Sequence, residues 1–277
     1  MARILAINSF VAHGHVGLSA MVPVLQGLGH DVMAVPTVVL SNHYGYDACG
    51  GFQVSAKQLE TMLSGLMTNG WLDEIDAVVS GYMAETDQVE LLAGGIEKLA
   101  DSGREFLFIC DPVLGDDPNG LYVPEDIAKG IRDDLLPMAD IVTPNRFELA
   151  WLSGTDVTDA ETADAAAEIL DVDLVVATSI PAIDGRLASL ISGADVAMQS
   201  VTAKHDGVPH GAGDLFAALF VGHVLNDCDD TEALARAAAG VDVVIGESLG
   251  GEELKLVPNL LRATKAEPLG LEDLSSD

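Results

Sequence analysis

Basic residues are scarce in this sequence. Thirteen lysines and arginines stand against 44 aspartates and glutamates, and the formal net charge is −31. Such a chain has little with which to neutralise phosphates, which argues against nucleic acid and anionic membranes as partners. The acidic excess suggests a surface adapted to salt, which we state as a hypothesis. If the substrate is itself an anion, a divalent metal and backbone dipoles must attract it.

Cysteines and long apolar runs are also few. Cys49, Cys110 and Cys228 are widely spaced and form no CxxC pair, so we expect reduced thiols and no structural zinc. No apolar run reaches the ~18 residues of a membrane span. The N-terminal segment 1–7 is too short and too soon polar to be a signal peptide. We therefore expect a cytoplasmic protein.

Two common nucleotide-binding motifs are missing, because the chain contains neither G-x-G-x-x-G nor G-x-x-x-x-G-K-[ST]. What it does contain is Gly211-Ala212-Gly213-Asp214, followed by an apolar helical stretch. Amides that open a helix lack internal partners and carry positive potential, so they can hold a phosphate without lysine. We expect these amides to bind a transferring phosphate, and Asp214 to accept a proton from the attacking hydroxyl. Alone, the motif is equally a turn with a helix cap.

Alternating strands and helices over residues 3–180 predict a three-layer α/β fold, with a mainly parallel central sheet and helices on both faces. An antiparallel hairpin at 187–201 is expected near an edge. With 49% apolar residues and no linker, we expect one domain, residues 1–266, and a flexible acidic tail, residues 267–277.

Several polar residues stand directly after apolar strands: Ser9, Tyr82, Asp111 and Asn145. Ligands of open parallel sheets bind beyond the carboxyl ends of the strands, so these residues are expected to meet at one site. Pro36 interrupts the run 32–40 and predicts an edge position or a break between two short strands.

Three further features each allow a structural and a functional interpretation. Asn145 and Glu148 fit a capping box, or Glu148 reaches Mg²⁺ through water. His13 and His15 are metal ligands or ordinary loop residues. The polar, aromatic loop 41–46 suits a flat heteroaromatic ligand or is an exposed loop tip.

These segments together resemble the pyridoxal kinases of the ribokinase-like superfamily, over about three quarters of the chain. The matching segments are Asn8-Ser9, Ser41-Asn42-His43, Ser80-Gly81-Tyr82, Cys110 to Asp116, Leu121 to Asp126, Thr143-Pro144-Asn145 with Glu148, Thr178-Ser179, and Gly211 to Asp214. Gly-x-Gly-Asp alone is weak, whereas Asp-Pro-Val-Leu-Gly-Asp and Ser-Asn-His are specific to the pyridoxal branch.

The resemblance implies ATP-dependent phosphorylation of the 5′-hydroxymethyl group of pyridoxal, pyridoxine or pyridoxamine, with Mg²⁺ and a monovalent cation, K⁺ or Na⁺. It implies that Asp214 is the base and Gly211, Ala212 and Gly213 the anion hole. The residues implied to bind the vitamer are Ser9, Val16, His43, Tyr44, Tyr82 and Asp214. Those implied to bind ATP are Asp111, Asp116, Tyr122, Thr143, Asn145, Glu148, Thr178, Ser179, Gly211 and Gly213, with Asp111 and Glu148 serving the metal.

Tyr44 departs from the threonine that many members have, and it is expected to narrow or reshape the vitamer pocket. The small-molecule substrates would be ATP and a vitamer, and a homodimer is expected by analogy. Two alternatives are a hydroxymethylpyrimidine kinase of the same superfamily and a non-catalytic vitamin B6 binding protein.

Overall fold

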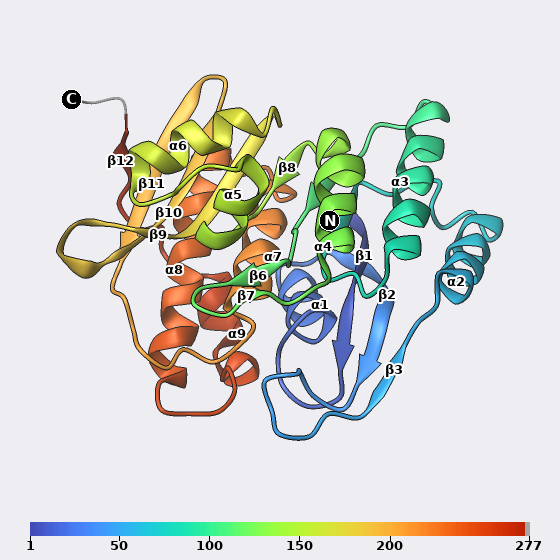
Figure 1. Cartoon of the computed structure of the whole chain (residues 1–277), viewed down its shortest axis with the longest axis horizontal. Helices are drawn as coiled ribbons and strands as arrows, with labels where there is room; N and C mark the ends of the chain where they lie inside the picture. Colours follow the sequence, from blue (N-terminus) through green and yellow to red (C-terminus); the bar gives the residue numbers. More distant parts are fainter. Residues whose placement is uncertain (275–277) are drawn as a thin grey trace.

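A twisted sheet crosses the molecule between two layers of helices (Figure 1). The structure is a computed structural model that describes residues 1–274. Over these residues the main sheet has ten strands in the order β12-β11-β10-β9-β8-β5-β4-β1-β2-β3. The strands are β1 (Arg3–Val11), β2 (Asp31–Leu40), β3 (Gly51–Gln53), β4 (Ala77–Ser80), β5 (Leu107–Cys110), β8 (Ile141–Val142), β9 (Leu174–Pro181), β10 (Leu187–Gly193), β11 (Val196–Thr202) and β12 (Glu272–Asp273), and a separate pair is β6 (Gly115–Asp116) with β7 (Gly120–Leu121).

The central strands are parallel, and antiparallel strands close both edges. Each neighbouring pair from β2 through β1, β4, β5 and β8 to β9 runs parallel, whereas β3 and the β10–β11 hairpin run antiparallel to their neighbours. The predicted sheet type and the predicted edge hairpin are therefore confirmed.

Helices cover both faces because the inner strands are apolar on both. In β4, Val78 packs into the core under one helix layer and Val79 into the core under the other, as the alternation of side chains along a strand requires. One layer holds α2 (Ala56–Thr68), α3 (Thr86–Asp101), α4 (Glu125–Gly130), α5 (Arg146–Ser153) and α6 (Ala160–Ile169); the other holds α1 (Leu18–Gly27), α7 (Ala212–Val224), α8 (Asp230–Ser248) and α9 (Leu256–Thr264).

Helix α7 is the innermost helix. Its residues Leu215 to His223 are all buried, because α1 and α8 pack against it on the sheet face. A helix that is apolar all round needs such surroundings. Its N-terminal turn is thereby fixed beside the carboxyl end of β1, where Asn8 contacts Asp214. None of the helices within residues 1–274 is long and apolar enough to cross a membrane.

Pro36 does not break its strand, so that alternative was wrong. β2 runs through it without interruption, and β3 pairs only with Val38–Leu40. The outer side of β2 at Pro36 is therefore unpaired, as the edge interpretation requires. The register with β1 shifts close by, between Asn8 and Phe10.

The acidic C-terminal segment is attached to the sheet as far as the structure describes it. Glu272 and Asp273 pair with Gln199 and Met198 of β11. Residues 275–277 of the predicted flexible tail lie outside the described residues.

Candidate active site

A cavity of about 900 Å³ opens at the carboxyl ends of the parallel strands. Its wall comes from the segments after β1, β4, β5, β8 and β9 and from the first turn of α7. Every residue that the sequence predicted for the site lines it: Ser9, Val16, His43, Tyr44, Tyr82, Asp111, Asp116, Tyr122, Thr143, Asn145, Glu148, Thr178, Ser179 and Gly211 to Asp214. The prediction that these strand ends meet at one place is confirmed.

The first turn of α7 has the geometry of an anion site. Gly211 is the N-cap with φ 101° and ψ 0°, a left-handed conformation that favours glycine. A Cβ atom there would also collide with the carbonyl oxygen of His15. Within residues 1–274, the amides of Ala212 and Gly213 have no acceptor. A Cβ built on Gly213 would meet nothing within 4 Å, and Gly211, Ala212 and Gly213 all line the cavity, so this turn borders open space.

Asp214 lies in the same turn and is half-buried. Burial raises the pKa of its carboxyl, and hydrogen bonds from the Gly17 amide and the Asn8 side chain only partly offset this. The sequence suggested the opposite, since a helix N-terminus favours the ionised form. Desolvation outweighs the dipole here, so Asp214 is a stronger base than its sequence position implies.

Asn8 fixes the direction of Asp214. The Oδ1 atom of Asn8 accepts hydrogen bonds from the amides of Ser9 (2.7 Å) and Tyr82 (2.9 Å). Its Nδ2 atom therefore points away from them and donates to Asp214 Oδ1 at 3.1 Å. Sequence reasoning gave Asn8 no role, although it carries the same strand-end signal as Ser9.

Three carboxylates line the cavity: Asp111 and Glu148, which are buried, and Asp214, which is half-buried. Burial is the main reason that the pKa of Asp111 is raised well above its usual range, and the charges of Asp214 and Glu148 add to it. Burial raises the pKa of Glu148 to about 7. In the described part of the chain, no lysine or arginine pairs with any of the three (salt bridges involve other acids). Crowded oxygen ligands without a counter-charge fit a hard divalent cation.

Glu148 forms the capping box that the sequence allowed. Asn145 Oδ1 accepts from the Glu148 amide at 3.0 Å, and Glu148 Oε2 accepts from the Asn145 amide at 2.9 Å. Glu148 Oε1 also accepts from Leu114 at 2.7 Å and Gly115 at 3.3 Å. The side chain thus joins α5 to the loop after β5. This structural role leaves a metal role open, because Oε2 accepts only one of these hydrogen bonds and keeps a second lone pair.

The opposite end of the cavity is less polar. Val16 and Tyr82 pack around a small apolar cluster of Val11, Val38 and Leu40. His43 and Tyr44 of the β2–β3 loop also line this end, and Tyr44 is 61% exposed. A flat ring with polar edges would fit between such walls.

His13 and His15 form no metal centre in this structure. Among residues 1–274, no group of three or more histidine, cysteine or acidic side chains is arranged to hold a metal ion by itself. Any cation at the carboxylates would therefore take ligands from a substrate as well.

Sequence reasoning also missed Arg146, Lys204 and His210, which line the cavity. Arg146 forms an ion pair with Asp117, whereas Lys204, within the described residues, forms none. His210 directly precedes Gly211, so its position next to the glycine motif was the available signal.

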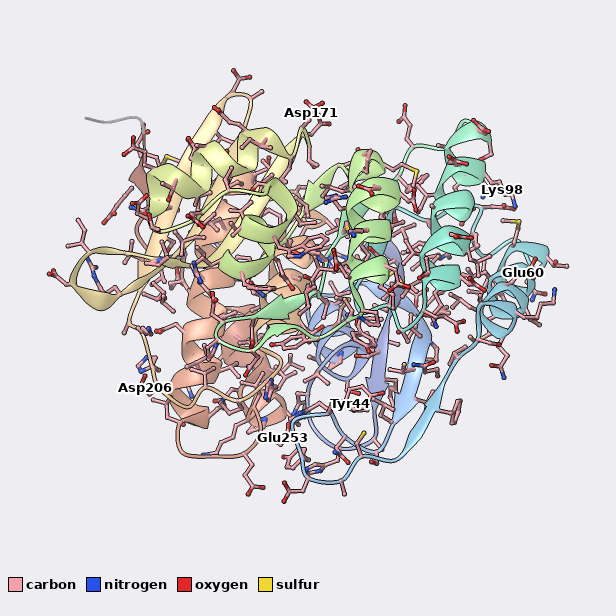
Figure 2. All side chains as sticks on the ribbon, viewed as in Figure 1. Tyr44, Glu60, Lys98, Asp171, Asp206 and Glu253 are labelled. Carbon is pink, nitrogen blue, oxygen red and sulfur yellow. The ribbon has the colours of Figure 1, made fainter. Side chains whose placement is uncertain are left out.

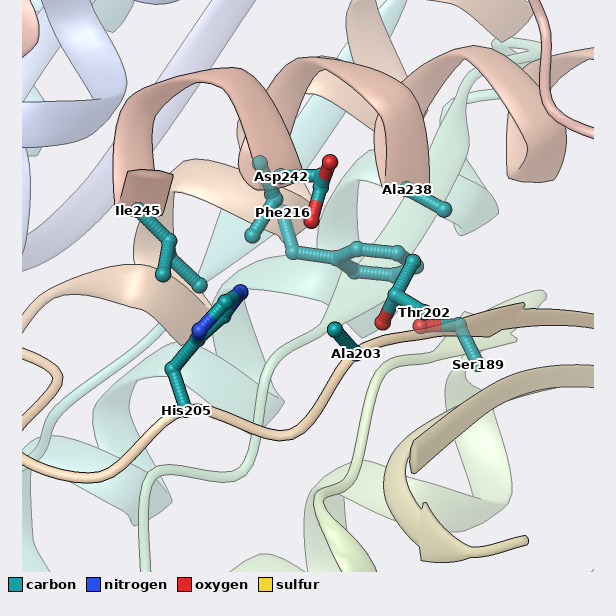
Figure 3. Close-up of a pocket in the computed structure, with 9 residues that line it drawn as sticks. Ser189, Thr202, Ala203, His205, Phe216, Ala238, Asp242 and Ile245 are labelled. Atoms are coloured by element: carbon teal, nitrogen blue, oxygen red, sulfur yellow. The ribbon is translucent and has the colours of Figure 1, made fainter. Parts of the chain in front are cut away.

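A second cavity, of about 50 Å³, lies behind the first turn of α7 (Figure 3). The ring of Phe216 and the side chain of His205 project between α8 and the segment after β11. It contains none of the predicted site residues and is too small for a nucleotide or a vitamer.

Comparisons with known proteins agree with this geometry. The family model described as phosphomethylpyrimidine kinase matches residues 14–255. The pyridoxal kinase PdxY of Corynebacterium diphtheriae is 35% identical, over 92% of this chain and 92% of that protein, and its namesake from Rubrobacter xylanophilus is 39% identical, over 92% and 91%. The crystal structure of Leishmania donovani pyridoxal kinase with ADP and pyridoxamine superposes with a TM-score of 0.90 at 30% identity, covering 97% of this chain and 98% of that one.

Proposed function

Because the chain belongs to the pyridoxal kinases of the ribokinase-like superfamily, we propose that its cavity phosphorylates the 5′-hydroxymethyl group of pyridoxal, pyridoxine or pyridoxamine with ATP. The observation that carries this proposal is the single cavity, which joins an apolar end at Tyr82 to the amides and carboxylate that open α7. A vitamer ring at the apolar end directs its alcohol toward Asp214.

The proposed chemistry is an in-line displacement. Asp214 accepts the hydroxyl proton as the alcohol oxygen forms a bond to the γ-phosphorus and the bond to the ADP oxygen breaks. The amides of Gly211, Ala212 and Gly213 stabilise negative charge on the transferring group. The raised pKa of Asp214 suits a base, and Asn8 and Gly17 hold the carboxylate toward the reacting alcohol.

An ATP-using kinase works with a divalent metal, and we propose Mg²⁺ held from Asp111 and Glu148. Bound there, the ion would supply positive charge to the phosphates in a cavity whose own walls are acidic. The three carboxylates of the cavity, none of which forms an ion pair within residues 1–274, support this assignment. We also propose that Thr143, with Thr178 and Ser179, contacts the phosphates or a K⁺ or Na⁺ ion.

The remaining predicted residues divide between the two substrates. We assign Ser9, Val16, His43, Tyr44 and Tyr82 to the vitamer. The predicted residues that we assign to the nucleotide are Asp116, Tyr122 and Asn145, and we add Lys204, which also lines the cavity. Their places at opposite ends of the cavity wall support this division.

Replacing the base tests the mechanism. Asp214→Asn should lower kcat by roughly 10²–10⁴ while pyridoxal still binds, as expected for the loss of a general base. Calorimetry measures the binding and a coupled ADP assay the turnover. A variant as active as the parent would remove Asp214 from the mechanism.

Two other functions are separated by the same assay. The name of the matching family model favours a pyrimidine substrate, so hydroxymethylpyrimidine is assayed beside the three vitamers. Turnover of hydroxymethylpyrimidine alone would establish the pyrimidine kinase. Binding of vitamers without ADP release would establish a non-catalytic binder, against which the intact Gly211–Asp214 motif speaks.

Two properties of the whole protein remain proposals that rest on the family. We propose a homodimer, which sedimentation velocity tests, and a location in the cytoplasm.

A further inference from the structure

The loop between β2 and β3 covers the vitamer end of the cavity and has little structure of its own. Its ends meet at Ser41 and Gly50, where the Ser41 amide donates to the Gly50 carbonyl at 2.7 Å. Inside it, Asn42 Nδ2 donates to the carbonyls of His43 (3.0 Å) and Ala48 (2.9 Å). These contacts shape the loop, but they do not fix its position over the cavity.

One side chain outside the loop holds its tip. The hydroxyl of Tyr46 donates to Glu253 Oε1 at 2.6 Å, and His43 Nε2 lies 3.5 Å from the same oxygen. Within residues 1–274, the hydrogen bond from Tyr46 is the one that joins residues 42–49 to the rest of the molecule. Figure 2 shows Tyr44 of this loop and Glu253 toward the lower edge of the molecule in that view.

Glu253 is itself well anchored. It lies between α8 and α9, and the buried Ser248 side chain accepts a hydrogen bond from the Lys255 amide at 2.9 Å. Glu253 Oε2 also accepts from the His15 amide at 3.3 Å. Gly14 leaves room for the Glu253 carboxylate, because a Cβ atom at that position would lie 2.5 Å from Glu253 Oε2. With its side chain only 16% exposed, Glu253 is a fixed point rather than a mobile surface acid.

The aromatic contacts extend from the same point toward the anion site. The rings of His43 and Tyr46 lie 4.7 Å apart and those of His43 and His210 lie 4.5 Å apart, between centroids. His43 and His210 both line the cavity, and His210 precedes Gly211. A shift of the loop tip would therefore displace groups that face the vitamer.

We propose that Glu253 is a positioning residue for the vitamer, which it serves by holding the 41–50 loop closed through Tyr46. Glu253 is not part of the cavity lining; its contact with the His15 amide anchors it, and its contact with Tyr46 holds the loop. This inference rests on the proposed function only for the identity of the ligand.

The first test needs no catalysis. Hydrogen–deuterium exchange of residues 42–49 is measured in the free full-length protein and in Glu253→Ala, with the exposed neighbour Glu252→Ala as the matched control. We expect exchange in this segment to quicken by about tenfold in Glu253→Ala and to stay unchanged in Glu252→Ala, because one charge-assisted hydrogen bond is lost. Equal exchange in all three proteins would overturn the proposal.

The second test separates positioning from general damage. In Glu253→Ala, KM for pyridoxal should rise about tenfold, while kcat and KM for ATP stay within about threefold. Tyr46→Phe should also raise KM for pyridoxal. The double variant should have a KM no higher than that of Glu253→Ala, because both substitutions remove the same hydrogen bond between Tyr46 and Glu253. Glu253→Gln keeps an acceptor for Tyr46 and should retain most of the affinity.

The outcomes distinguish this proposal from the proposed function. If the wild-type protein phosphorylates no vitamer, the function fails while the exchange experiment still decides the role of Glu253. If it is active but Glu253→Ala lowers kcat and both affinities alike, or Tyr46→Phe is silent, the positioning role is wrong.

Discussion

The hydrogen bond from Asn8 to Asp214 fixes the orientation of the carboxyl group that we propose as the base. The two residues are 206 positions apart in sequence, and Asn8 is 1% exposed. Because the amides of Ser9 and Tyr82 occupy its oxygen, Asn8 can only donate to Asp214. That donation favours the carboxylate, and so limits how far burial raises the pKa of Asp214.

Changing Asn8 should therefore move the pH profile. In Asn8→Asp the acceptor for both amides remains, but a second carboxyl faces Asp214, so the pKa of Asp214 should rise further. The acid limb of kcat/KM should move up by about one pH unit, so that kcat/KM at a fixed pH on this limb falls about tenfold. Rate measurements from pH 5 to 9 check this, and an unmoved limb would contradict it.

The raised pKa of Glu148 predicts how the stability of the protein changes with pH. Its pKa of about 7 in the folded protein exceeds the ordinary 4.5, so the folded state holds the proton more tightly. The resulting stability is complete below about pH 4.5 and is lost as the pH rises through 7. Without metal, the midpoint of thermal unfolding should fall over this window more steeply in the wild type than in Glu148→Gln.

The same variant separates the two roles of Glu148. Its carboxylate accepts three backbone hydrogen bonds, so Glu148→Gln should unfold at a lower temperature in either case. If Glu148 also serves the metal, the Mg²⁺ concentration for half-maximal activity should rise. An unchanged Mg²⁺ requirement would leave it as a helix cap alone.

The elements that place these residues were largely predictable from the sequence. The sequence pattern of residues 86–101 predicts a helix, which is observed at Thr86–Asp101, and the predicted hairpin is observed at its turn residues. Short strands such as β3 and β12 were not predicted, because two or three residues carry no periodicity. Helix α8 runs to Ser248, past the expected start of a loop at Gly246, since tertiary packing overrides the low helix propensity of glycine.

Contacts between distant loops were the part that could not be predicted. Most predicted site residues lie near the carboxyl end of a strand or at the start of a helix, and topology alone brings such positions together. The contact of Asn8 with Asp214 and that of Glu253 with Tyr46 depend on the directions of side chains that are more than 200 residues apart in the sequence. No local pattern contains that information.

The glycines that open α7 should differ in what they tolerate. Gly211→Ala combines a positive φ, which costs about 1–3 kcal/mol, with a collision at the His15 carbonyl, so it should unfold at a clearly lower temperature and lose activity. Gly213→Ala has free space and helical geometry, so its unfolding midpoint should match the wild type. Thermal scans of both proteins decide this. A Gly211→Ala protein of wild-type stability would contradict the assigned turn.

At the scale of the whole molecule, charge is the dominant feature. Forty-four acidic residues cannot all find partners among 13 basic ones, so like charges repel across the surface. The cavity repeats this imbalance, because Asp111, Glu148 and Asp214 all line it.

Salt should therefore stabilise the protein. Between about 50 mM and 2 M KCl the Debye length falls from above 10 Å to below 3 Å, so the unfolding midpoint should rise by about 5 °C or more. Scans in NaCl control for the choice of cation. A midpoint and an activity that are the same at low and molar salt would reject the hypothesis of a salt-adapted surface.

The contact between Asn8 and Asp214 also has a consequence for synthesis on the ribosome. The first strand emerges early, whereas the carboxylate that it orients is translated 206 residues later. Until then the side-chain amide of Asn8 in β1 has no Asp214 to donate to, and the nascent chain cannot turn over substrate. Catalytic competence thus arrives late in translation, as a property of the nearly finished chain.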